Sequence, residues 1–321
     1  MLKVNQLIGF GGSAGGIVAT GHAYTAGGQP GRSALTDKLT YSDETNAAAT
    51  TANLTVGRIQ GCCFSDASTA GYFAGGNTSG AGDQTTLVDK VVFSTDTTAA
   101  ETSAALSVGK ASGSGHSSPT DGYFLGGNTT PTTMVDLADK MVFSTEITSA
   151  VATANLSINV QNQGGLGSTT DGYSMGGLTT GTVDQLVVDK LVYSTDTTAA
   201  ETSAQLTQSR REPQGPNGIT EGWVAGGYKT AVAHVDTCDE LTYSTDTTIA
   251  QTSANLTTAK AGISWNSNGV SKGYWSGGSS GAFTDTAEAV TFSTATTALV
   301  ATADLTFSLG NMFGGCSSVY H

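Results

Sequence analysis

The chain repeats itself about every fifty residues. A glycine pair recurs six times at intervals of 48 to 51 residues, each time three positions after an aromatic residue. The six pairs end at Gly28, Gly76, Gly127, Gly177, Gly227 and Gly278. A fixed period of this length is typical of solenoids and propellers, in which each repeat is one supersecondary unit that packs against its neighbours.

Each repeat contains segments with the pattern of β-strands. The segment after a glycine pair and a polar loop, such as DKVVFS at 89–94, alternates with period two and is rich in valine and aromatics. A turn rich in Thr and Asp follows, then a segment with a recurrent leucine, and finally a Gly/Ser-rich stretch that leads to the next pair. Four short strands per repeat, without helical periodicity, predict a six-bladed β-propeller of four-stranded blades.

The composition agrees with an all-β fold. Charged residues make up 12% of the chain, about half the usual share, and 43 of the 321 residues are glycine. Threonine favours strands because it is β-branched, and glycine favours turns because it adopts backbone angles that other residues avoid. Hydrophobic residues, 38% of the chain, recur in register with the repeat, which excludes a disordered chain.

The repeat resembles that of kelch-type β-propellers over essentially the whole chain. The resemblance depends on the glycine pair after an aromatic-containing second strand, the aromatic third strand and the period. The chain differs in lacking the regular fourth-strand Trp and a regular Arg ahead of the first strand. That place is taken by Arg58, Lys110, Arg210 and Lys260, with Asn159 near it in another copy. The resemblance implies one propeller domain formed by residues 1–321.

Seven Gly-rich first-strand segments serve six blades. The segments GGIVATGH (15–22) and GGCSSVYH (314–321) match from the glycine pair to the final His. Residues 1–20 and 310–321 are therefore competing closure strands for the first blade. We expect the C-terminal one to close the ring, because both chain ends then contribute to one blade. The spare segment would act as an assembly arm, for instance by adding to the sheet edge of another subunit.

Charge and cysteine content narrow the classes of function. The formal net charge of −13 opposes nucleic-acid binding. The four cysteines lack C-x-x-C spacing, so neither a zinc site nor a disulfide framework is indicated. No apolar run reaches the ~18 residues of a membrane span, and the N-terminus makes a poor signal peptide. We therefore expect that the protein is made in the cytoplasm of a host cell and carries no signal peptide.

An acidic residue opens each predicted third strand. These residues are Asp37, Asp89, Asp139, Asp189, Asp239 and Glu288. Asp89 shares a strand face with Val91 and Phe93, so its carboxylate should face the packed interior. A buried carboxylate needs hydrogen-bond donors, and we expect backbone N–H groups to supply them. A hard cation such as calcium is the alternative. Repetition in every blade favours a structural role over catalysis.

The stretch STDTTAAETSA occurs at 94–104 and again at 194–204. It is predicted to form the outer hairpin turn and outer strand of a blade. Asp96 and Asp196 are expected to shape the turn by bonding to nearby backbone, as Asp does in turns.

Positions that depart from the repeat are the better candidates for recognition. Arg210, Arg211 and Trp265 interrupt inner-strand segments that otherwise hold small residues. Trp265 is suited to stack on a sugar or a partner side chain, or to fill a gap at a blade junction. Four histidines and four arginines, scattered along the chain, indicate neither a copper centre nor an arginine cluster for a carboxylate, and no cofactor is expected.

These observations favour a non-enzymatic structural or binding propeller. The composition and short, near-identical repeats resemble propeller proteins of bacteriophage particles, such as tail-fibre, receptor-binding or decoration proteins. The resemblance implies a location in the virion, an extracellular particle, with virion structural proteins or a host-surface glycan as partners, and homo-oligomerisation stays open. The alternative is a kelch-type protein-interaction scaffold unrelated to virions, and a carbohydrate-active or copper propeller enzyme comes third.

Overall fold

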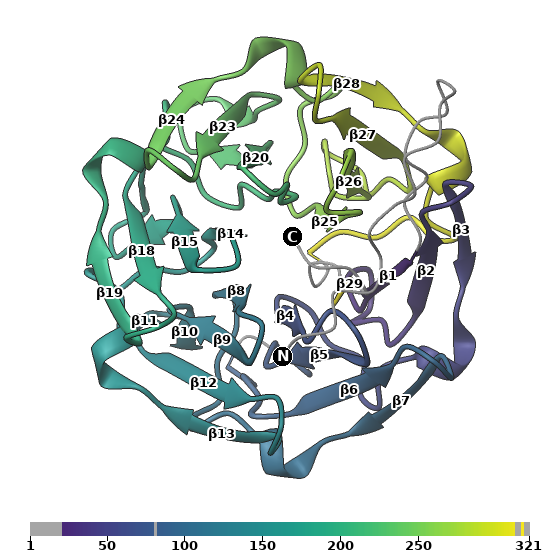
Figure 1. Cartoon of the computed structure of the whole chain (residues 1–321), viewed down its shortest axis with the longest axis vertical. Helices are drawn as coiled ribbons and strands as arrows, with labels where there is room; N and C mark the ends of the chain where they lie inside the picture. Colours follow the sequence, from purple (N-terminus) through teal and green to yellow (C-terminus); the bar gives the residue numbers. More distant parts are fainter. Residues whose placement is uncertain (1–20, 80–81, 312–315, 318–321) are drawn as a thin grey trace, which may run out of the picture.

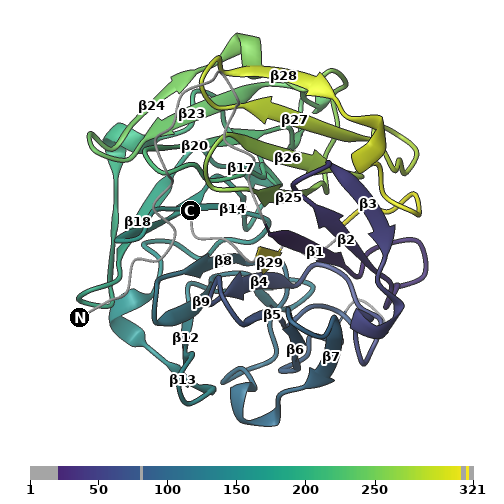
Figure 2. The ribbon, with the colours of Figure 1, turned by 45° about the vertical axis from the view of Figure 1, so that its right-hand side comes forward.

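Six antiparallel sheets stand as blades around a common axis (Figure 1). The computed structural model describes residues 21–79, 82–311 and 316–317. The innermost strands surround the centre of the ring and the outermost strands form its perimeter, as the turned view also shows (Figure 2). The six-bladed β-propeller predicted from the repeat is confirmed.

From the axis outward, each of the first three blades contains four strands. The first blade contains β29 (Cys316–Ser317), β1 (His22–Ala26), β2 (Thr36–Thr40) and β3 (Thr45–Ala48). The second contains β4 (Cys62–Ser65), β5 (Ala70–Ala74), β6 (Val88–Val92) and β7 (Thr97–Ala100). The third contains β8 (Ser114–Ser117), β9 (Asp121–Leu125), β12 (Ala138–Val142) and β13 (Ile147–Ala150).

The remaining blades follow the same order. The fourth contains β14 (Gly164–Gly167), β15 (Asp171–Met175), β18 (Val188–Val192) and β19 (Thr197–Ala200). The fifth contains β20 (Glu221–Ala225), β23 (Cys238–Thr242) and β24 (Thr247–Ala250). The sixth contains β25 (Ser264–Ser267), β26 (Lys272–Ser276), β27 (Ala287–Thr291) and β28 (Thr296–Leu299).

Short elements occupy the connections. Three hairpins follow glycine pairs: β10 (Asn128–Thr130) with β11 (Thr133–Met134), β16 (Leu178–Thr179) with β17 (Val183–Asp184), and β21 (Tyr228–Lys229) with β22 (Ala233–His234). A 3-10 turn follows each outer strand: η1 (Thr50–Ala52), η2 (Thr102–Ala104), η3 (Ala152–Ala154), η4 (Thr202–Ala204), η5 (Thr252–Ala254) and η6 (Ala301–Ala303). We call the side of the ring with the loops after the glycine pairs the hairpin face, and the opposite side the turn face.

The fifth blade has a broken innermost strand. Its inner segment keeps only two isolated bridges to β20, Gln214 with Ala225 and Asn217 with Gly222. Pro213 precedes this segment and Pro216 lies within it, and a proline cannot donate a backbone hydrogen bond to a ladder. The prolines therefore account for the missing strand without disturbing the rest of the blade.

The first blade is completed from the far end of the chain. Strand β29 pairs with β1 through Cys316 opposite Tyr24 and Ser317 opposite Ala23. The C-terminal candidate thus fills the innermost position of this blade, and residues 1–20 lie outside the described residues. Sequence-distant strands are in this way hydrogen-bonded neighbours in one sheet.

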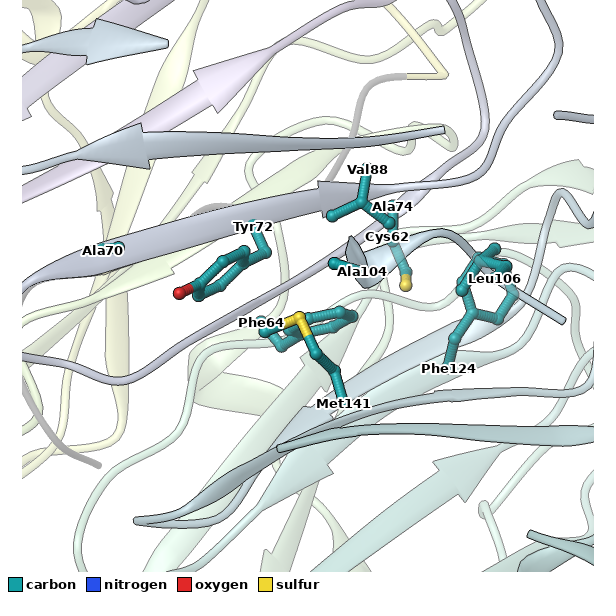
Figure 3. Packing of buried hydrophobic residues seen from close by; sticks show 10 residues of the cluster. All are labelled: Cys62, Phe64, Ala70, Tyr72, Ala74, Val88, Ala104, Leu106, Phe124 and Met141. Atoms are coloured by element: carbon teal, nitrogen blue, oxygen red, sulfur yellow. The ribbon is translucent and has the colours of Figure 1, made fainter. Parts of the chain in front are cut away.

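Apolar side chains fill the seams, by which we mean the spaces between neighbouring blades. In the seam between the second and third blades, Phe64 and Tyr72 of one blade meet Phe124 and Met141 of the next (Figure 3). The other members include Leu106, one of the six recurrent leucines, all of which are buried. Burial of a side chain of this size contributes about 1.5–3 kcal/mol, so each seam holds the ring together.

The glycine pairs join each blade to the next linker. Gly75 and Gly76 both have positive φ, 65° and 100°, which glycine adopts without strain. A Cβ on Gly75 would lie 2.4 Å from the backbone oxygen of Lys110, and the N–H of Gly76 donates to that same oxygen at 2.8 Å. The pair is required both for its backbone angles and for this close approach.

Five perimeter clamps join successive blades. In each clamp a Tyr and a Lys of one blade bind the carboxylate in the outer turn of its neighbour. Tyr24 and Lys38 of the first blade bind Asp96 of the second in this way. The others are Tyr72–Lys90–Glu146, Tyr123–Lys140–Asp196, Tyr173–Lys190–Asp246 and Tyr274–Lys272–Glu44. The repeated turn therefore carries an inter-blade contact, whereas the sequence led us to expect local backbone bonds from Asp96 and Asp196.

Candidate functional site

The six repeated carboxylates are built into the seams between blades. Each accepts the backbone N–H of the residue that follows the recurrent leucine, as Asp89 does from Thr55 at 3.1 Å. The others are Asp37 with Thr306, Asp139 with Ser107, Asp189 with Ser157, Asp239 with Thr207 and Glu288 with Thr257. All six are at most 5% exposed, so these carboxylates do not form a surface site.

Four of the carboxylates also face a buried cation. The ion pairs are Arg58–Asp89 at 2.7 Å, Lys110–Asp139 at 3.0 Å, Arg210–Asp239 at 3.1 Å and Lys260–Glu288 at 2.9 Å. Val160 and Leu309 take the cation's place in the other two linkers, since each follows its leucine by the same four residues. Val160, not the neighbouring Asn159, is therefore the equivalent position in the third linker.

Arg210 is one of these four buried cations and is therefore not a binding residue of the surface. Its side chain is 0% exposed, and Nη2 donates to the carbonyl oxygen of Val224 at 3.1 Å. Burial lowers the pKa of its guanidinium, and the charge of Asp239 opposes that shift. Arg210 thus holds the fourth linker against the fifth blade, which makes our expectation of a binding role for it wrong.

Arg211 lies on the hairpin face, held by its neighbours. Its Nη1 binds Asp184 at 2.8 Å and Thr230 at 3.1 Å, and its guanidinium stacks over the ring of Tyr228, 4.2 Å from the centroid. The side chain is 20% exposed. Arg211 therefore joins the β16–β17 hairpin to the β21–β22 hairpin.

A belt of side chains encircles the axis near the turn face. Its side chains come from equivalent inner-strand positions, namely Ser65, Ser117, Asn217, Ser267 and Ser317, and the sixth position is a glycine, Gly167. Ser317 Oγ donates to Ser267 O at 2.9 Å, and Ser65 Oγ donates to Ser317 O at 2.8 Å. Ser117 Oγ and Asn217 Oδ1 accept backbone N–H groups from Ser65 and Gly167. The belt ties the inner strands together and lines the axis with hydroxyl and amide groups.

A second ring lies at the hairpin-face end of the axis. It contains Gln60, Ser112, Asn162, Glu212, Gly262 and Asn311, all with φ between 52° and 63°. Backbone N–H groups of this ring donate to the carbonyl of the preceding blade's member, as Asn162 does to Ser112 at 2.6 Å. Burial raises the pKa of the Glu212 carboxyl in this ring, and the charge of Arg211 and the backbone N–H of Gly262 oppose that rise. A hollow lies between these residues on the axis.

Trp265 stands at the axial position that other blades fill with small residues. The equivalent residues of the other inner segments are Cys63, Gly115, Gly165 and Gly215. Strands approach so closely here that a Cβ on Gly115 would lie 2.3 Å from the backbone oxygen of Cys63. Because its counterparts are so small, one indole fits beside the axis. Trp265 is half-buried and packs against the apolar cluster between the fifth and sixth blades.

An axial pocket opens beside Trp265 on the turn face. It is a hollow of about 570 Å³, including the solvent at its mouth. Hydroxyls and an amide supply most of its polar lining, among them Ser65, Ser117, Thr169, Asn217 and Ser317. No Asp, Glu, Lys or Arg of the described residues lines it, although the chain carries a net charge of −13.

His116 keeps the axial pocket uncharged. Its Nδ1 lies 3.1 Å from the carbonyl oxygen of Leu166, which can only accept, so Nδ1 carries the proton. Nε2 then accepts from one of the hydroxyls of Ser114 and Ser174, which both lie at 3.0 Å, and these two hydroxyls share a hydrogen bond of 2.6 Å. Burial lowers the pKa of His116 to about 4, so the ring is neutral near pH 7. The pocket therefore combines an aromatic wall with neutral hydrogen-bonding groups.

Of the three sequence-derived binding candidates, only Trp265 lines this pocket. Asn217 and His116 were missed. Asn217 stands where the other inner segments hold Ser or Gly, so an alignment of the six inner segments would have marked it, whereas the place of His116 varies from blade to blade. No cluster of three His, Cys, Asp or Glu suited to a metal ion, and no helix fit to span a membrane, occurs within residues 21–79, 82–311 and 316–317.

Comparison with known proteins supports the fold. No protein-family model matches the chain, and no curated protein matches it. Among solved structures, the chain is similar to that titled "Structure of YjhT", with a TM-score of 0.69 over 88% of this chain and 97% of that one. The two share 13% sequence identity, a level at which the similarity establishes the propeller architecture and no activity.

Proposed function

We propose that this propeller is a non-enzymatic binding module and that a neutral carbohydrate binds in its axial pocket. The observation that carries the proposal is Trp265, a large aromatic at an axial position where the repeat otherwise places Gly or Cys. An indole beside hydroxyl and amide groups suits a sugar ring, which has apolar C–H faces and hydroxyl edges. The absence of charge from the described lining of a strongly acidic chain favours an uncharged ligand.

The roles of the charged groups support binding over catalysis. Six repeated carboxylates are committed to backbone N–H groups of the seams, and four of them to buried cations as well. His116 could orient a hydroxyl, but Ser114 and Ser174 beside it are at most 4% exposed. A catalytic acid or base needs to reach a substrate within hydrogen-bonding distance. Burial of these groups therefore argues against a propeller enzyme.

A glycan panel tests the axial pocket. Trp265→Ala is expected to lower affinity for a bound neutral glycan at least tenfold, about 1.4 kcal/mol, while Trp265→Phe keeps most of it. Ile219→Ala is the matched control, because Ile219 is an apolar residue of the turn face that is 68% exposed and does not line the pocket. Unchanged glycan binding by a folded Trp265→Ala variant would contradict the proposal.

The wider setting we propose is a virus particle. A tail-fibre, receptor-binding or decoration protein needs a rigid module that holds structural proteins or touches a host-surface glycan, and the propeller fold supports a binding or scaffold role. The perimeter of short, near-identical Thr- and Ala-rich strands has the composition that first indicated this class. Co-purification with intact particles in fixed stoichiometry is expected. Recovery only as a free cytosolic protein, absent from particles, would refute it.

The second candidate is a kelch-type protein-interaction scaffold outside virions. It is favoured by the loops of the hairpin face, where three added hairpins enlarge the surface of the third, fourth and fifth blades. Affinity purification that yields one stoichiometric non-viral partner, lost when these hairpins are shortened, would support it over the virion setting.

A further inference from the structure

A further hollow lies on the hairpin face, away from the axial pocket and next to the hollow between the ring residues Gln60, Ser112 and Asn162. It measures about 550 Å³, including the solvent at its mouth, and lies over loops of the first four blades. Six amide side chains contribute to its lining: Gln60, Asn77, Gln84, Asn128, Gln161 and Asn162. Arg32 is the only charged residue among the described residues around it.

Arg32 differs from every other cation in the described part of the chain. Ten of the twelve lysines and arginines described there form ion pairs, and Lys229 donates to Gln208. Arg32 does neither, and its Nε is buried without a partner. In a protein with net charge −13, a guanidinium left without a carboxylate is available for an external anion.

Two asparagines of the hollow leave acceptors unused. Asn77 Nδ2 donates to Gln60 Oε1 at 2.9 Å, and Asn128 Nδ2 donates to the carbonyl oxygen of Thr130 at 3.0 Å. These bonds fix the amide orientations, so Oδ1 of each side chain is left without a donor. Both residues are 7% exposed. A buried acceptor without a donor is destabilising, and a hydroxyl bound there would remove that cost.

We propose that this amide-lined hollow binds a carboxylate-bearing sugar of the uronic acid type. The carboxylate pairs with Arg32, and ring hydroxyls donate to the asparagine oxygens while the remaining amides supply donors. An inorganic anion without an O–H group, such as sulfate, would pair with Arg32 but could not donate to the two acceptors, and a neutral sugar would leave the guanidinium unpaired. The site is separate from the axial pocket and does not depend on it.

Calorimetry with the full chain and trigalacturonate as the probe tests this site. Binding is expected to weaken at least tenfold when the probe's carboxyl groups are methyl-esterified, and to weaken as salt is added. Inorganic sulfate at equal ionic strength should compete poorly, because it has no O–H group to donate to the asparagine acceptors. Equal affinity for the ester, or no binding of trigalacturonate at millimolar concentration, overturns the proposal.

Variants separate this site from the proposed axial one. Arg32→Gln should lower trigalacturonate affinity at least tenfold, and Arg32→Lys should retain part of it because the charge remains. Both keep a side chain at a residue whose φ is 55°, so the loop conformation is equally compatible with each. Lys229→Gln, a cation of the same face outside the hollow, and Trp265→Ala should leave affinity within twofold. Loss with Trp265→Ala, or retention with Arg32→Gln, refutes the assignment.

Discussion

At the scale of single residues, the equivalent acids of the six seams occupy different electrostatic environments. Asp139 is buried against Lys110, whose pKa is lowered by burial, while the charge of Asp139 opposes that shift. Asp189 is equally buried, but Val160 stands in the cation's place, and the Asp189 Oδ1 has no partner. Asp37 also faces no cation, and its carboxylate instead accepts hydrogen bonds from Oγ1 of Thr306 and Nδ2 of Asn46. One repeated carboxylate thus serves as an ion-pair partner in some seams and as a hydrogen-bond acceptor in others.

The pair Asp139 and Asp189 makes this difference measurable. Asp139→Asn leaves the Lys110 ammonium buried without a counter-charge, so the free energy of unfolding should fall by about 3–5 kcal/mol. Asp189→Asn removes a buried charge that faces no cation, so its cost should be below about 1 kcal/mol. Urea unfolding of the two variants and the parent chain checks this. Equal losses would mean that the ion pair does not distinguish the seams.

At the scale of elements, five seams are clamped at the perimeter and one is not. Between the fifth and sixth blades, Trp223, Glu240 and Ala295 replace the Tyr, Lys and acid of the clamp together. Trp223 stacks on Phe292 with ring centroids 4.4 Å apart, and so keeps the ring contact that the clamp tyrosines also make, without their bond to a carboxylate. In a complete clamp, burial alone would raise the pKa of Asp96, but hydrogen bonds from Lys38 and Tyr24 bring it below its usual range. The carboxylate of that clamp is therefore stabilised as an anion.

Introducing a clamp between the fifth and sixth blades tests how much such a contact contributes to stability. Ala295→Asp alone should destabilise the fold slightly, because the new carboxylate approaches Glu240. Glu240→Lys alone should be near neutral, since the residue is partly exposed. The double variant should be more stable than the sum of the two by about 0.5–1 kcal/mol, the size of a partly exposed ion pair. Additive effects in this double-mutant cycle would show that the two positions do not form an inter-blade contact.

At the scale of the whole molecule, the ring is closed by a strand of which two residues are described. Cys316 packs in one apolar cluster with Tyr24, Cys63 and Phe73, and so joins the first blade to the second. Ser317 also bonds through its Oγ to the sixth blade, at Ser267 O. The strand therefore contacts the blades on both sides of the first, and its loss would open the axis as well as one sheet edge.

Terminal deletions compare the two competing closure segments. Deletion of residues 312–321 removes β29 and exposes the cluster around Tyr24, so the free energy of unfolding should fall by about 3–5 kcal/mol. Deletion of residues 1–20 leaves every described contact of β29 in place and should leave the unfolding midpoint nearly unchanged. Urea unfolding of both variants is the measurement. A larger loss from the N-terminal deletion would assign closure to that segment.

The sequence by itself determined the architecture. The six glycine pairs, the alternating third strands and the recurrent leucines are local patterns, each repeated in every blade, so their period fixes blade number and strand order. The repeated acids were also identified as buried structural groups, because strand alternation places Asp89 on the same face as Val91. Sequence reasoning could not assign their cationic partners, since Arg58 and Asp89 become neighbours only when the linker packs against the second blade.

Only the tertiary structure decided which irregular residues meet. Arg210 and Arg211 are adjacent in sequence, yet the first is buried against Asp239 and the second lies on the hairpin face. Trp265 can stand beside the axis because glycines of blades one to three places away leave room for its indole. Arg32 is distinguished because no carboxylate of the described residues pairs with it, which only the folded chain can show. Such relations depend on the placement of whole blades around a ring, which no local pattern encodes.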